Sequence, residues 1–158
     1  MPTYSNPSLA PLTPIPSAVG PLIHDRRTFD PAAAAGYRPP SLIIGDDIVL
    51  FTVPAGCVLV PHLCRFAFPV IDSAGSPTGQ ASIGTTAVPA ALRAAQSVGT
   101  AVRVDSGEDF LQPAAPIGNP TEPVNVVLRF TAAVATLAAS GQIVCDFVTR
   151  AYRTDIDG

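Results

Sequence analysis

Prolines are concentrated in the first quarter of this 158-residue chain. Nine of the 18 prolines lie between Pro2 and Pro40. Because proline fixes φ and lacks a backbone N–H donor, neither a helix nor a central strand is expected to persist there. We therefore predict an extended, proline-rich N-terminal arm over residues 1–40, partly in the polyproline conformation.

The predicted arm is more apolar than an ordinary disordered linker. Its recurring aliphatic side chains are Leu9, Leu12, Ile15, Val19, Leu22 and Ile23. An extended segment can lie along another protein and insert such side chains into shallow pockets. We predict that these six residues bind a partner.

Residues 41–158 have the pattern of a β-domain. Apolar and polar residues alternate most clearly over residues 124–130 and 143–152, which is typical of strands with one buried face. Residues 138–141 are predicted to join these two strands as an antiparallel hairpin. Further short strands are expected over residues 48–53, 57–60, 62–71, 80–84 and 100–104.

Residues 88–98 are the one segment with helical signals. Pro89 suits a first turn, Gly99 suits a helix end, and Leu92, Ala95 and Val98 would share an inward face. Many short strands with a single helix predict a mainly β fold. We expect an antiparallel β-sandwich or jelly-roll-like barrel with one short helix, preceded by the extended proline-rich arm.

This chain is poor in charged residues. Charged residues make up 13% of the chain, about half the usual share, and the formal net charge is −3 without a basic stripe. Such a composition argues against nucleic-acid binding and suggests a surface covered by another protein. No apolar run is long enough to span a bilayer and no signal peptide is seen, so no membrane partner is expected.

Catalytic and metal-binding patterns are weak. The two histidines, His24 and His62, accompany no nucleophile-elbow sequence, so no enzyme and no small-molecule substrate is predicted. Cys57, His62 and Cys64 fall at core positions, and an odd count of three cysteines favours reduced, buried thiols in a protein assembled in a cytoplasm. The acidic turn at residues 105–109 leaves calcium binding open, although a solvated turn is the plainer interpretation. No cofactor is predicted.

The body resembles the head decoration (cement) proteins of tailed bacteriophages over roughly residues 45–155. The segments that carry the resemblance are Ile48-Val49-Leu50-Phe51-Thr52-Val53-Pro54-Ala55-Gly56, Ser82-Ile83-Gly84-Thr85 and Gly107-Glu108-Asp109-Phe110-Leu111-Gln112-Pro113. The resemblance implies a non-enzymatic virion protein on the capsid exterior, assembled in the host cytoplasm. Its implied partners are the major capsid protein and further copies of itself, with a trimer expected by analogy.

Two other functions remain open from the sequence. One is another virion component, such as a neck, tail or head-fibre base protein. The other is a ligand- or carbohydrate-binding β-module. The absence of tryptophan disfavours the carbohydrate module, although Tyr37 and Tyr152 are candidate platform residues.

Overall fold

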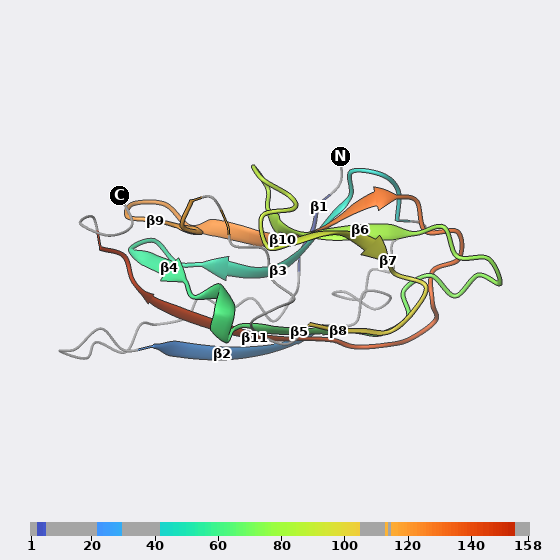
Figure 1. The fold of residues 1–158 in the computed structure, drawn as a ribbon, viewed down its shortest axis with the longest axis horizontal. Helices are drawn as coiled ribbons and strands as arrows, with labels where there is room; N and C mark the ends of the chain where they lie inside the picture. Colours follow the sequence, from blue (N-terminus) through green and yellow to red (C-terminus); the bar gives the residue numbers. More distant parts are fainter. Residues whose placement is uncertain (1–2, 6–21, 30–41, 105–112, 114, 154–158) are drawn as a thin grey trace.

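The computed structural model describes residues 3–5, 22–29, 42–104, 113 and 115–153. These residues form two β-sheets that pack as a sandwich. Figure 1 shows β6, β7 and β10 in the upper layer and β2, β5, β8 and β11 in the lower layer. The predicted mainly β sandwich is therefore confirmed.

The first sheet has five strands. In spatial order they are β1 (Thr3–Ser5), β3 (Asp47–Val53), β10 (Val124–Ala132), β6 (Gln80–Thr85) and β7 (Arg93–Ser97). The pairing of β1 with β3 is parallel, and the other neighbours in this sheet are antiparallel.

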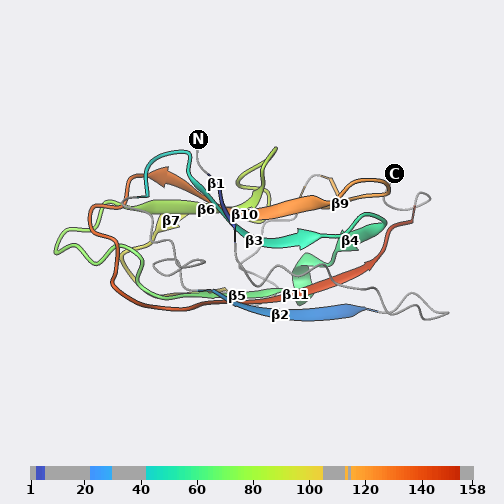
Figure 2. The same cartoon turned by 180° about the vertical axis from the view of Figure 1, so that it is seen from behind.

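The second sheet has six strands and is built around its longest. Its members are β2 (Ile23–Phe29), β4 (Cys57–Leu59), β5 (Arg65–Phe68), β8 (Val102–Val104), β9 (Gly118–Asn119) and β11 (Ile143–Ala151). Strand β2 pairs with β11 along residues 143–149. Because a strand has only two edges, β5 and β4 follow one another along the opposite edge of β11. Figure 2 shows β2 beside β11 from behind.

Aromatic side chains fill the space between the sheets. The ring of Phe51 in β3 stacks on that of Phe147 in β11, with centroids 4.2 Å apart. Phe66 of β5 meets Phe147 edge-on at 5.1 Å. All three rings are almost fully buried, so the two sheets share one hydrophobic core.

The predicted helix over residues 88–98 is wrong. Residues 93–97 are the edge strand β7, and Leu92 and Val98 extend the pairing by donating backbone N–H groups to Ile83 and Gly79. Leu92 and Val98 are buried as expected, but Ala95 is exposed. A short alanine-rich segment gains little from helix formation alone, so pairing with β6 decides its structure.

Two further local predictions are also wrong. Strands β10 and β11 do not form a hairpin, because the chain between them crosses from the first sheet to the second. His62 does not face the core with Cys64 and Phe66, because it lies exposed in the 3-10 turn η2 (Pro61–Leu63) before β5 begins.

Two strands lie within the first 40 residues. Strands β1 and β2 contain no proline, and each is an edge strand of its sheet. Each sheet therefore includes a strand from the predicted arm.

Candidate interaction surfaces

The structure describes two of the six apolar residues predicted to bind a partner. Leu22 is exposed and Ile23 is half-buried at the start of β2, where it pairs with Thr149. Leu9, Leu12, Ile15 and Val19 lie outside the described residues. Residues 6–21 join β1 to β2, so both ends of this segment are fixed in the protein's own sheets.

The outer face of the second sheet carries a small charged cluster. Asp146 in β11 has Arg26 of β2 and Arg65 of β5 as its direct cross-strand neighbours. Its Oδ1 lies 3.8 Å from Arg26 Nε and 3.6 Å from His24 Nε2. The charges were visible in the sequence, but only the strand register shows that they meet on one face.

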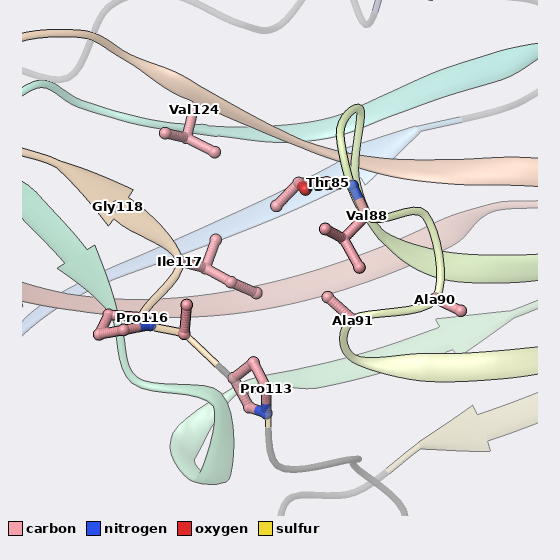
Figure 3. A pocket seen from close by; sticks show the side chains of 10 residues that line it. Thr85, Val88, Ala90, Ala91, Pro113, Pro116, Ile117, Gly118 and Val124 are labelled. Atoms are coloured by element: carbon pink, nitrogen blue, oxygen red, sulfur yellow. Dashed lines mark hydrogen bonds between the residues drawn. The ribbon is translucent and has the colours of Figure 1, made fainter.

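An apolar hollow of about 420 Å³ opens beside the start of β10. Figure 3 shows Val88 and Ala91, from the loop after β6, close to Ile117, from the segment that leads into β9. Its lining residues include no charged and no aromatic side chain. The hollow therefore suits aliphatic side chains better than a sugar or a nucleotide.

A hydrogen-bonded turn before β3 displays two further apolar side chains. Ile43 and Ile44 are 50% and 66% exposed. The turn is held by a bond from the Ile43 N–H to Asp46 Oδ2 (3.1 Å) and one from the Gly45 N–H to the Phe130 carbonyl (2.8 Å). Gly45 has a φ of 92°, which favours glycine.

The remaining buried acids bind the protein's own groups. Asp47 accepts two hydrogen bonds from Arg129 across β3 and β10, at 2.7 and 2.5 Å, which raises the pKa of the guanidinium. Asp72, in the loop that follows β5, is buried and accepts five backbone N–H bonds. Burial alone would raise the pKa of the Asp72 carboxyl, but the N–H donors outweigh it and hold that pKa well below its usual range. These carboxylates are structural.

The three cysteines are free and buried, as predicted. Burial raises the pKa of the Cys57 and Cys145 thiols and brings that of Cys64 to about 11. The thiols are therefore protonated and poorly reactive at neutral pH.

Metal and sugar sites find little support in the described part of the chain. Within it, no three His, Cys, Asp or Glu side chains are grouped so that they could hold a metal. The acidic turn at residues 105–109 lies outside the described residues. So does Tyr37, while Tyr152 is half-buried after β11. Among the described residues, no helix is long and apolar enough to cross a membrane.

Known proteins resemble this chain in structure rather than in sequence. No protein-family model matches the sequence, and a search of curated proteins finds no similar chain. A chain in the structure of the capsid of Ralstonia phage GP4 matches 97% of this chain and 100% of its own length, with a TM-score of 0.62 and 21% identity. A chain in the capsid asymmetric unit of cyanophage Pam1 matches 93% of this chain and 97% of its own length, with a TM-score of 0.57 and 13% identity. The protein thus shares its fold with chains found in the capsids of two phages.

Proposed function

We propose that this chain is a non-enzymatic capsid decoration protein of a tailed bacteriophage. The observation that carries the proposal is the match to a chain of the GP4 capsid over nearly the whole length of both chains. A full-length match means that the two chains have similar sizes and the same complete fold. The low charge content and the exposed aliphatic residues agree with a surface that contacts other proteins.

The proposed partner is the lattice of the major capsid protein, bound on the outside of the shell. Further copies of the chain are proposed as neighbours, and a trimer rests on analogy with decoration proteins alone. Weak contacts add up to strong attachment when they are physically linked, as in an oligomer that touches several capsid subunits at once. The protein would thereby hold adjacent capsid subunits together against internal pressure.

The apolar residues of the arm are proposed to contact the shell. Since β1 and β2 fix both ends of residues 6–21, this segment would act as a loop tied to the domain rather than as a free tail. Two fixed ends lower the entropy that the segment loses on binding. The segment contains four apolar residues that could make this contact, namely Leu9, Leu12, Ile15 and Val19.

The test is binding of the purified protein to empty shells assembled from the major capsid protein of the same phage. We expect the parent protein to cosediment with shells and to saturate at a number of sites comparable to the capsomers. A variant with Leu9, Leu12, Ile15 and Val19 each changed to Ser should fold normally, because β1 and β2 are untouched, and should bind much more weakly. Equal binding by this variant would contradict the proposed role of the arm. If the parent protein did not bind shells, the proposed decoration function would be wrong.

A further inference from the structure

The outer face of the second sheet has one acidic group between two basic ones. In the register of β2, β11 and β5, Arg26, Asp146 and Arg65 form one cross-strand row. Directly opposed residues on neighbouring strands point to the same face of a sheet. With strands about 4.8 Å apart, the two arginines start roughly 10 Å from one another, on either side of Asp146.

The positive charge in this row is only partly neutralised. The contact between Arg26 Nε and Asp146 Oδ1 is long, at 3.8 Å, and the Arg26 side chain is 66% exposed. Arg65 is exposed and has no ion pair with any described residue. Asp146 Oδ1 is buried and accepts no hydrogen bond from the described residues. Both guanidinium groups therefore keep donors free for a partner.

Charge complementarity identifies the kind of partner. Two arginines about 10 Å apart suit two carboxylates with the same separation, since arginine binds carboxylates through paired hydrogen bonds. The aspartate between them would repel a continuous row of phosphates, and the whole chain is negatively charged, so a nucleic acid is disfavoured. Among the described residues Glu122 is the one acidic side chain classed as exposed, so this part of a second copy offers no exposed pair of carboxylates.

We propose that the outer face of β2, β11 and β5 docks on an acidic protein surface that presents a pair of carboxylates to Arg26 and Arg65. This inference rests on the proposed function, and it names the face of the sandwich that lies against the shell.

The test compares charge reversals in the shell-binding assay. Arg26→Glu and Arg65→Glu are each expected to lower the affinity for shells about tenfold, and the double variant more strongly. Raising the sodium chloride concentration should weaken binding of the parent much more than binding of the double variant, because the salt screens this contact. Arg153→Glu is the matched control, since it changes the net charge equally at an exposed position after β11. It should bind within about twofold of the parent.

The outcomes separate this inference from the function on which it rests. If the parent binds shells and the double variant binds as the Arg153→Glu control does, the docking face is wrong and the decoration function stands. If the parent does not bind shells, both are wrong. Binding of the parent to a short DNA duplex at the same salt, lost in the double variant, would also overturn the assignment to an acidic protein. Unchanged melting temperatures would exclude misfolding as the cause of lost binding.

Discussion

The carboxylate of Asp72 ties together two loops at one end of the sandwich. Its Oδ2 accepts from the N–H groups of Thr78 (3.0 Å), Gly79 (2.9 Å) and Ala135 (3.1 Å). Its Oδ1 accepts from those of Ala74 (3.2 Å) and Thr136 (3.0 Å). The residue is 1% exposed. We predict that Asp72→Ala is among the most destabilising single changes outside the aromatic core.

The expected magnitude follows from the donors that the substitution leaves behind. Five bonds to a charged acceptor, at about 1.5–3 kcal/mol each, set an upper limit of roughly 8–15 kcal/mol. Most of these donors lie near the surface, where water can replace the carboxylate, whereas Gly79 is buried. We therefore expect a loss of about 3–5 kcal/mol in the free energy of unfolding.

Asp72→Asn separates the charge from the shape of this side chain. The asparagine amide oxygen can take the place of Oδ2 and still accept from Thr78, Gly79 and Ala135. The amide NH2 group then takes the place of Oδ1 and faces the N–H donors of Ala74 and Thr136. A loss of about 2–4 kcal/mol is expected at neutral pH. Because the folded-state pKa of Asp72 lies below its unfolded value of about 3.9, its contribution is complete above roughly pH 5 and declines as the pH falls further. The gap between the parent and Asp72→Asn should therefore shrink at acidic pH.

Urea unfolding followed by far-ultraviolet circular dichroism measures these differences. Glu122→Gln is the control, because it removes an exposed carboxylate and should change stability by less than about 0.5 kcal/mol. A parent-like unfolding free energy for Asp72→Ala would refute the account of the network. A gap between parent and Asp72→Asn that stays constant from neutral to acidic pH would refute the account of its charge.

Three further changes test other parts of the structure. Phe147→Ala removes the ring that touches both Phe51 and Phe66 and should cost about 3–5 kcal/mol in urea unfolding; a loss below about 1 kcal/mol would contradict the shared core. Gly84→Ala would place a Cβ atom 2.2 Å from the Val88 carbonyl oxygen, so the melting temperature should fall by several degrees, whereas Gly75→Ala, with open space around it, serves as the control. Because Cys64 and the other two thiols are buried, a thiol reagent at about pH 8 should label none of them until the protein is unfolded, and rapid labelling of the native protein would contradict their burial.

The strands with one buried face could be predicted from the sequence. In β11, Ile143, Cys145 and Phe147 point into the core while Asp146 does not, as the alternation indicated. Side-chain alternation reports on the burial of each face, and burial is set by the sandwich as a whole. For this reason the fold class and several strand positions were accessible without a structure.

The connections between strands could not be predicted in the same way. A turn rich in alanine, serine and glycine is compatible both with a hairpin and with a crossing between sheets, so the sequence at residues 138–141 did not distinguish them. Residues 93–97 have helical propensity, and their pairing with the preceding strand β6 is a tertiary contact that local propensity does not contain.

The candidate interaction residues were likewise only partly predictable from the sequence. The recurring aliphatic residues in the first 40 residues suggested a segment that binds a partner. The sequence did not show that strands β1 and β2 pair with the two sheets, because that pairing is tertiary. The row of Arg26, Asp146 and Arg65 joins residues from three distant segments, so no local motif marks it. Asp72 stood within a turn-like loop, and its burial depends on donors more than 60 residues away, in Ala135 and Thr136.

The copy number of this protein in purified phage particles tests the decoration function most directly. Quantitative mass spectrometry against the major capsid protein provides the measurement. A decoration protein repeated across the shell should be present in hundreds of copies per particle, in a simple ratio to the capsid subunits. A dozen copies or fewer would place it in the neck, the tail or a head-fibre base instead, and its absence from particles would contradict a virion role altogether.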